Sequence, residues 1–222
     1  MKVAIYSGVV PNPTFIERLI QGLAKSGIKI YLFGQLEGKP SYTEKNIHPI
    51  VHKTRLGKLR NAASAFFGLF LFRFNELKKY FQLRKSLGIR FWLRELPVLW
   101  HKPDIFHVQW AKSVSDWLWL QEFGVKVVLS LRGAHINYSP LTVPGLADSY
   151  RINFLKIDAF HAVSQAILNE GLKYGINPSK AKVIYSGLNL SEIPFFEKTF
   201  ENDKTIKILS VGKSHWKKGK YL

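Results

Sequence analysis

The chain repeats one pattern, in which a short and almost continuous apolar run precedes a longer segment whose apolar residues recur every three or four positions. Its first unit has an apolar run over residues 2–7, an amphipathic segment over 14–25 and a second apolar run over 28–34. Continuous runs of this length predict strands buried on both faces, and the helical period predicts a crossover helix between them. The first unit therefore predicts a strand, a helix and a second, parallel strand.

The same alternation continues to residue 185. We expect further strands over 46–52, 104–109, 125–131, 159–163 and 182–185, and helical segments over 113–123, 145–156 and 164–174. Between residues 55 and 100 the pattern is helical, with breaks near Asn75 and near residues 87–89, and Pro103 ends it. Strands that alternate with helices over the whole length predict an α/β fold with a doubly wound parallel sheet.

Composition narrows the class of protein. Apolar residues make up 46% of the 222 residues, as in a globular domain. The chain has no cysteine, which excludes disulfides and thiolate zinc sites, and its seven histidines lack metal-ligand spacing, so no metal is predicted. The N-terminus lacks the pattern of a secretory signal, and the longest uncharged apolar stretch, residues 62–72, is about half of a membrane span. These features favour a cytoplasmic protein.

The chain is strongly basic, with 33 Lys and Arg residues against 15 Asp and Glu residues and a formal net charge of +18. Much of the excess lies between residues 53 and 102, where only Glu76 and Glu95 are acidic. The cations there are Lys53, Arg55, Lys58, Arg60, Arg73, Lys78, Lys79, Arg84, Lys85, Arg90, Arg94 and Lys102. A charge of this sign attracts polyanions or anionic lipid.

Aromatic and aliphatic residues alternate with these cations, which is typical of a helix in a membrane interface. The alternative is an aromatic core with a solvated cationic rim, and the continuity of the apolar run over 66–74 indicates that part of it is buried. We expect peripheral contact with an anionic membrane surface on its cytoplasmic face. Exchange of Lys78, Lys79, Arg84 and Lys85 for Glu should then abolish that contact.

Ligands of an open parallel sheet bind beyond the carboxyl ends of its strands, where loops diverge and helices begin. The residues that end the predicted strands are mostly small, polar or basic, and no carboxylate is among them. They are Gly8 with Asn12; His107 with Gln109 and Trp110; Arg132 with Gly133 and His135; Ser164; Ser186 with Gly187 and Asn189; and Gly212 with Lys213.

Five segments, in this order and spacing, resemble glycosyltransferase family 4. They are residues 104–110, 129–135, 160–164, 183–189 and 208–213 with 218–219. The resemblance spans nearly the whole chain and implies the GT-B fold, in which two Rossmann-like domains face a cleft. In that fold the N-terminal domain mainly holds the acceptor, and the C-terminal domain holds the sugar nucleotide.

The resemblance also implies a domain organisation. Residues 1–190 would form the acceptor domain, with a basic and aromatic helical insertion near 55–100, and residues 191–205 would form a linker. Residues 206–222 would be the first strand and loop of the donor domain, whose remainder is expected beyond Leu222. The 222-residue chain alone is therefore expected to be inactive.

The family's phosphate-binding pair falls on Lys213 and Lys218, where cations would offset the charge of a departing nucleoside diphosphate. Arg132 stands where the family often has a histidine near the donor sugar. A guanidinium is no general base near neutral pH, so Arg132 is expected to stabilise anionic oxygens. His107 is the other catalytic candidate, with a structural hydrogen-bonding role as the alternative. Further donor contacts are expected at Gly8, Ser186, Gly187 and Gly212.

The implied reaction is retaining transfer of a hexosyl group from a nucleotide sugar to a saccharide or lipid-linked acceptor, in the synthesis of a polysaccharide or glycolipid. It needs no protein nucleophile if the departing phosphate accepts the acceptor's proton, and no cofactor is expected. Two alternatives stay open. A basic nucleic-acid-binding protein would explain the charge, although no helix-turn-helix, zinc site or aromatic strand platform supports nucleic acid as a partner. A GT-B relative such as a sugar-nucleotide epimerase is the other.

Overall fold

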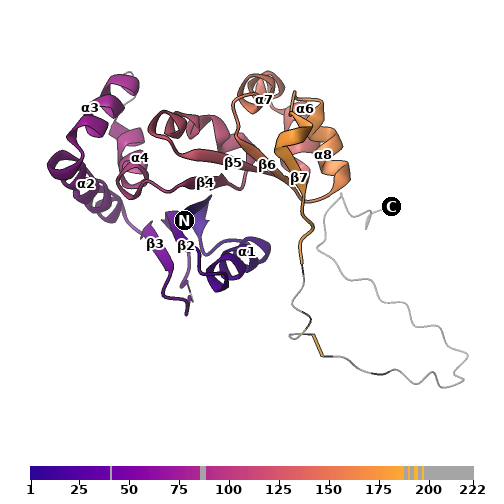
Figure 1. Cartoon of the computed structure of the whole chain (residues 1–222), viewed down its shortest axis with the longest axis horizontal. Coiled ribbons are helices and arrows are strands. Elements are labelled where there is room, and N and C mark those ends of the chain that lie inside the picture. The colour runs from indigo at the N-terminus through magenta and orange to yellow at the C-terminus, as the bar shows by residue number, and fades with distance from the viewer. Residues whose placement is uncertain (41, 86–88, 188–189, 191–192, 195–196, 198–222) are drawn as a thin grey trace, which may run out of the picture. The chain divides into compact units, whose positions relative to one another are not determined.

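Seven parallel strands form one sheet in the order β3-β2-β1-β4-β5-β6-β7 (Figure 1). They are β1 (Lys2–Val10), β2 (Lys29–Leu36), β3 (Ile47–His52), β4 (Ile105–Val108), β5 (Lys126–Leu131), β6 (Ala159–Ala162) and β7 (Ala181–Val183). The chain first builds outward from β1 to β3 and then returns to build the other half from β4. The switch point of this doubly wound sheet lies between β1 and β4. The predicted α/β fold is confirmed.

The computed structural model describes residues 1–40, 42–85, 89–187, 190, 193–194 and 197. The chain divides into two compact units, Met1–Ser186 and Gly187–Leu222. The first unit contains the sheet. Most of the predicted linker over 191–205 and the whole predicted strand and loop over 206–222 lie outside the described residues.

Strand β1 shows why the sheet forms at these apolar runs. Val3 and Ile5 belong to one buried cluster, together with Ile16 and Ile20 of helix α1 (Thr14–Lys25). Ala4 and Tyr6, which alternate with them, belong to a second and larger cluster. Because successive side chains of a strand point to opposite faces, both faces of β1 are buried.

The remaining helices follow the predicted positions with two differences. The predicted helices over 145–156 and 164–174 are α7 (Leu146–Phe154) and α8 (Gln165–Leu172). The segment predicted as a helix over 113–123 is a pair of 3-10 helices, η1 (Ala111–Asp116) and η2 (Leu118–Phe123). The short helices α5 (Gly133–Asn137) and α6 (Ser139–Thr142), and the 3-10 helix η3 (Pro178–Lys180), were not predicted, because elements of one or two turns have too few residues to display a period.

The basic and aromatic segment forms three helices, α2 (Arg55–Phe72), α3 (Phe74–Leu83) and α4 (Ile89–His101) (Figure 1). Helix α4 packs on the face of the sheet that carries Tyr31 and Phe33. The first break lies at Arg73, two residues before its predicted position. The Thr54 side chain caps α2 by accepting a hydrogen bond from the Gly57 N–H. Gly68 brings α2 close to α4, because a Cβ there would lie 2.9 Å from the Trp100 ring.

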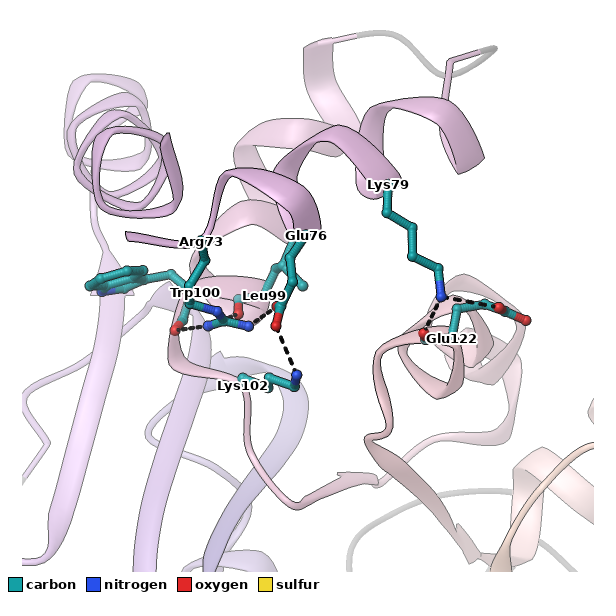
Figure 2. Close-up of polar contacts among 7 residues, drawn as sticks. All are labelled: Arg73, Glu76, Lys79, Leu99, Trp100, Lys102 and Glu122. Carbon is teal, nitrogen blue, oxygen red and sulfur yellow. Dashed lines mark hydrogen bonds and ion pairs between the residues drawn. The ribbon is translucent and has the colours of Figure 1, made fainter. Parts of the chain in front are cut away.

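Several cations of this segment bind protein groups (Figure 2). The Arg73 guanidinium donates to the carbonyl oxygens of Leu99 at 3.1 Å and Trp100 at 2.9 Å, and it pairs with Glu76. Lys102 also pairs with Glu76, at 2.9 Å. These contacts join the start of α3 to the end of α4, so the two cations stabilise the insertion itself.

Glu95 is a buried acid inside the same insertion, with no exposed surface. The Arg84 guanidinium donates to its two oxygens at 3.1 and 2.6 Å, and the Tyr80 hydroxyl donates at 3.0 Å. Burial and the Glu95 charge raise the pKa of Tyr80, which keeps this hydroxyl a donor. Arg94 lies 3.7 Å from Glu95 and donates to Asp116 at 3.0 Å. A charged cluster therefore joins α3, α4 and η1.

Strand β1 does not end at Gly8 but continues to Val10 with a bulge. Ile5 pairs with Leu32 and Gly8 with Gly34, so β1 has one more residue than β2 between these pairs. Gly8 has a φ of +91°, and a Cβ on Gly34 would lie 2.5 Å from the Gly8 carbonyl oxygen. The two strands approach this closely at their carboxyl ends because both residues are glycine.

Candidate functional site

The candidate site lies at the carboxyl edge of the sheet, around the switch point between β1 and β4. Gln109 follows β4 and is fully buried, and its Oε1 accepts a hydrogen bond from Arg132 at 2.8 Å. Arg132 follows β5, and its guanidinium lies 4.5 Å from the centre of the Phe15 ring on α1. The end of β4 and the start of α1 therefore hold this guanidinium from two sides.

Arg132 retains unused hydrogen-bonding capacity. Its Nε is buried and has no hydrogen-bond partner among the described residues. Burial lowers the pKa of Arg132 to about 10, so the group still carries its charge near neutral pH. A half-buried cation with a free donor can stabilise an anionic oxygen, as the sequence predicts.

His107 belongs to a chain of hydrogen bonds that crosses three strands. Its Nε2 lies 2.9 Å from the Ser130 hydroxyl, which lies 3.0 Å from Nδ1 of His161. His161 Nε2 is 3.0 Å from the carbonyl oxygen of Ile184, so that nitrogen must carry a proton. Neutral His161 then accepts from Ser130 at Nδ1, and Ser130 in turn accepts from His107.

Electrostatics keep His107 neutral. Burial, the neighbouring His161 and the Arg132 charge lower the pKa of His107 to about 3. Ser130 also lies 3.4 Å from Gln109 Oε1, so the network that holds His107 reaches the Arg132 partner. The structure thus brings the two predicted catalytic residues into one polar network. Within it His107 acts as a structural donor, and its part in catalysis stays a prediction.

The other strand-end residues have identifiable surroundings. Trp110 donates to the Ser7 carbonyl oxygen at 3.1 Å and stacks on the His135 ring at a centroid distance of 5.1 Å. Ser164 caps α8 by accepting from the Ile167 N–H. Asn12 is buried, and its Nδ2 donates to Glu17 at 3.0 Å. These residues shape the edge of the sheet.

The predicted donor residues are placed only in part. Gly8 lies in the β1 bulge described above. Ser186 and Gly187 are exposed and lie on either side of the division between the two units. Gly212, Lys213 and Lys218 lie outside the described residues, so their predicted phosphate contacts remain predictions.

A pocket of about 180 Å³ lies on the other side of the bulge, between the ends of β1, β2 and β3 and the helices α2 and α4. It is lined by Tyr6, Gly8, Phe33, Gly34, Gln35, Ile50, His52, Lys58, Asn61, Leu93, Arg94 and Pro97. Of these only Gly8 was singled out as a site residue from the sequence. Gln35 and His52 stand at the carboxyl ends of β2 and β3, where ligands of an open parallel sheet bind, so their place at the end of an apolar run is the signal that indicates them.

Among the described residues, no helix is long and apolar enough to cross a membrane. Nor does any group of three or more His, Asp or Glu side chains in the described part of the chain form a site for a metal ion.

Comparison with known proteins identifies a family. Residues 13–192 match the model of Glycosyltransferase Family 4. A search of curated protein sequences finds no significant match.

Solved structures show a similar fold at low sequence identity. The OtsA apo structure is 13% identical, with a TM-score of 0.52, and the match covers 87% of this chain and 51% of that one. An E. coli structure described as trehalose-6-phosphate bound with UDP-2-fluoro glucose is also 13% identical, with a TM-score of 0.51 and coverage of 87% and 50%. Anabaena HepE in complex with UDP-glucose is 14% identical, with a TM-score of 0.48 and coverage of 86% and 45%. The chain spans about half the length of these relatives.

Proposed function

The chain belongs to glycosyltransferase family 4, and from this we propose that the protein transfers a sugar from a nucleotide-sugar donor to a saccharide or lipid-linked acceptor. The observation that carries the proposal is the match of the family model to residues 13–192, which include every described strand from β2 to β7. The E. coli structure with a similar fold is described as bound with UDP-2-fluoro glucose, which supports a uridine diphosphate sugar as the first donor to test.

We propose that Arg132 stabilises the anionic leaving group or a hydroxyl of the donor sugar. Its charge, its free Nε and its fixed position support this role. A nucleoside diphosphate gains negative charge as the glycosidic bond breaks, and a preorganised cation lowers the energy of that transition state. We propose a retaining reaction in which the departing phosphate accepts the acceptor's proton.

We propose a hexosyl donor and an acceptor that belongs to a polysaccharide or glycolipid, made in the cytoplasm. We also propose that the 222-residue chain alone lacks transferase activity, since it spans about half the length of proteins with a similar fold. We propose that Lys213 and Lys218 bind the diphosphate of the donor.

To test this, the longest protein that the coding region encodes is incubated with each of a panel of nucleotide sugars. Release of nucleoside diphosphate is measured. We expect release from at least one donor and a fall of about 100-fold or more in the rate for Arg132→Met, the size of effect seen when one donor to a developing anion is removed. Arg18→Met, on the exposed face of α1, is the matched control. No release from any donor would contradict the proposal, and interconversion of sugars without transfer would favour an epimerase.

We further propose that helix α2 lies on an anionic membrane surface. Its residues Ala62, Ala65 and Leu69 are buried, whereas the opposite side exposes large apolar side chains. Leu56 is 75% exposed, Phe67 61% and Leu71 69%. These exposed positions recur at helical spacing, so they form a stripe along α2 that faces away from the core.

The charges beside this stripe are the ones that can meet lipid phosphates. Lys53, Arg55 and Arg60 are exposed and have no ion-pair partner among the described residues. Arg73, Lys79, Arg84, Arg94 and Lys102 are instead engaged in ion pairs within the protein. Because Arg84 holds the buried Glu95, the predicted exchange of Arg84 for Glu would disturb folding as well as lipid contact. Substitution of exposed cations near the start of α2 tests lipid contact without disturbing this buried ion pair.

We expect the protein to sediment with phosphatidylglycerol vesicles and not with phosphatidylcholine vesicles. The double variant Arg55→Glu and Arg60→Glu should lower the partition coefficient at least thirtyfold, because each cation near an anionic surface contributes about 1 kcal/mol. Lys25→Glu with Lys182→Glu is the matched control, since both residues are exposed and the change in net charge is the same. Equal loss in both double variants, or tight and salt-sensitive binding to generic nucleic acid without vesicle binding, would contradict the proposal.

A further inference from the structure

We propose that the corner between α2 and α3, residues 70–74, inserts phenylalanine side chains into the acyl-chain layer of a membrane. The two helices meet at Arg73, which ends α2 and precedes α3. This inference rests on the proposed contact of α2 with an anionic membrane and adds a second attachment. Because that attachment is apolar, it resists salt, whereas attraction between cations and lipid phosphates does not.

The corner exposes large apolar side chains next to one another. Phe70 is 49% exposed, Phe72 76% and Phe74 53%. Leu71 between them is exposed as well. Proteins that act as free monomers seldom expose a contiguous apolar patch, so a patch of this kind indicates a surface that meets a partner or a membrane.

The exposed rings are held in place from behind. The Phe70 ring stacks on Phe66 at a centroid distance of 6.3 Å and meets the Phe74 ring edge-on at 5.6 Å. Phe66 in turn packs against the larger buried cluster. The Phe72 ring lies 6.4 Å from the Trp100 ring of α4. Because these rings are already ordered, they lose little side-chain entropy when they enter a membrane.

The one charge of the corner is turned inward. Arg73 is the only charged residue between residues 61 and 75. Its guanidinium binds Glu76 and the carbonyl oxygens of Leu99 and Trp100 (Figure 2). These bonds hold the cation against the end of α4 and leave the outer surface of the corner to the apolar rings.

The charges around the corner select a lipid bilayer as the partner. The exposed cations that flank it in sequence are Arg60 and Lys78, whereas Glu76, the one acid of α2 and α3, is held by Arg73 and Lys102. Anionic phosphates above a hydrocarbon layer complement an apolar corner with cations around it. A second copy of the chain would bring its own cations against these, which disfavours a dimer at this surface.

The corner lies at the opposite edge of the sheet from Arg132. Helix α2 begins just after β3 ends, at the carboxyl edge, and its 18 residues span about 27 Å. At its far end Arg73 contacts the end of α4, just before β4 begins. Changes in the corner should therefore leave nucleoside diphosphate release unaffected when the acceptor is water-soluble.

Vesicle sedimentation at about 0.1 M and about 1 M NaCl tests the insertion, because the screening length falls from about 10 Å to about 3 Å. We expect the 222-residue chain to stay bound to phosphatidylglycerol vesicles at the higher concentration. Phe72→Ser with Phe74→Ser should lower the partition coefficient at least about tenfold at both concentrations. Leu141→Ser with Leu155→Ser is the matched control, since it removes two exposed apolar side chains elsewhere, and it should change nothing.

A fluorescent label measures the depth of the corner. The chain has no cysteine, so Phe72→Cys provides a unique thiol for a fluorophore. We expect lipids brominated on their acyl chains to quench this fluorophore. The same fluorophore on Leu141→Cys, which is 81% exposed in the unchanged protein, should not be quenched.

Three results would overturn the insertion and leave the surface contact of α2 intact: loss of all binding at about 1 M NaCl, unchanged binding of the Phe72 and Phe74 double variant, or equal quenching at the two labelled positions. Absence of binding at both salt concentrations would refute both membrane proposals. A dimer in the absence of lipid that the double variant dissociates would also overturn the insertion. Failure of the transferase proposal is read separately, from nucleoside diphosphate release.

Discussion

Individual polar residues in this protein owe their roles to partners that are distant in sequence. Arg84 binds Glu95 across a helix boundary, and Arg132 binds Gln109 from the neighbouring strand. In both cases one partner is fully buried. A buried acid or amide that loses its partner cannot turn to water, so removal of one member costs more than the pair itself contributes.

Glu95→Ala tests this at the most buried acid of the insertion. We expect the free energy of unfolding to fall by about 3–5 kcal/mol, because Arg84 and the Tyr80 hydroxyl would lose their shared acceptor. Urea unfolding followed by circular dichroism measures the change. Glu122→Ala is the control, since its pair with Lys79 is exposed and is worth about 1 kcal/mol or less. Equal losses would show that the buried cluster is dispensable.

The histidine network predicts a dependence of stability on pH. The folded-state pKa of His107 is lowered to about 3, below its ordinary value of 6.5. The unfolded chain therefore binds the proton more readily, and the stabilising contribution, complete above pH 6.5, is lost as pH falls toward the folded pKa. The slope amounts to at most about 1.4 kcal/mol per pH unit for one histidine.

We expect His107→Gln to lose less stability than the unchanged protein between pH 7 and pH 4.5. Urea unfolding at a series of pH values gives both curves, and their difference isolates His107 because other acid-sensitive groups are common to both. His161, whose pKa burial also lowers, contributes to both curves in the same direction. Parallel curves would mean that His107 is solvated and can take up a proton in the folded state.

At the scale of elements, the edge of the sheet depends on how closely β1 and β2 approach beyond the bulge. Gly8 and Gly34 face each other there, and the pocket opens between them and the insertion helices. The strand pattern predicted β1 and β2 but placed the end of β1 at Gly8, since an apolar run does not reveal a bulge. Only the paired register shows that both glycines are needed.

Gly34→Ala should destabilise the protein by more than about 2 kcal/mol, because the new Cβ would lie 2.5 Å from the Gly8 carbonyl oxygen and neither backbone can move freely. Gly22→Ala is the control, and its expected effect on stability has the opposite sign. Its Cβ meets nothing within 4 Å on the exposed side of α1, so the helix should gain up to about 1 kcal/mol. Thermal and urea unfolding of the two variants should therefore shift in opposite directions, and a neutral Gly34→Ala would contradict the close approach.

At the scale of the whole molecule, the sequence predicted the sheet and most of its helices because buried parallel strands leave continuous apolar runs. It could not separate structural from free cations within residues 53–102, since the partners come from other elements: Lys102 reaches back to Glu76, and Arg94 reaches forward to Asp116. The pocket and the His107 network could not be predicted from the sequence for the same reason. Their residues become neighbours only through the strand order and through the fold of the insertion.

We predict that the first compact unit, Met1–Ser186, folds independently as a domain. All seven strands and both buried clusters of the described residues lie within it. The described residues after it, such as Leu190 at 77% exposed and Ile193 at 49%, contribute little to any core. A chain that ends at Ser186 should therefore unfold in one cooperative transition with an unchanged midpoint. A chain that ends at Asp158 is the control: it lacks β6, which pairs with β5 and supplies His161, and should not fold. Loss of cooperativity in the longer truncation would show that residues beyond Ser186 complete the domain.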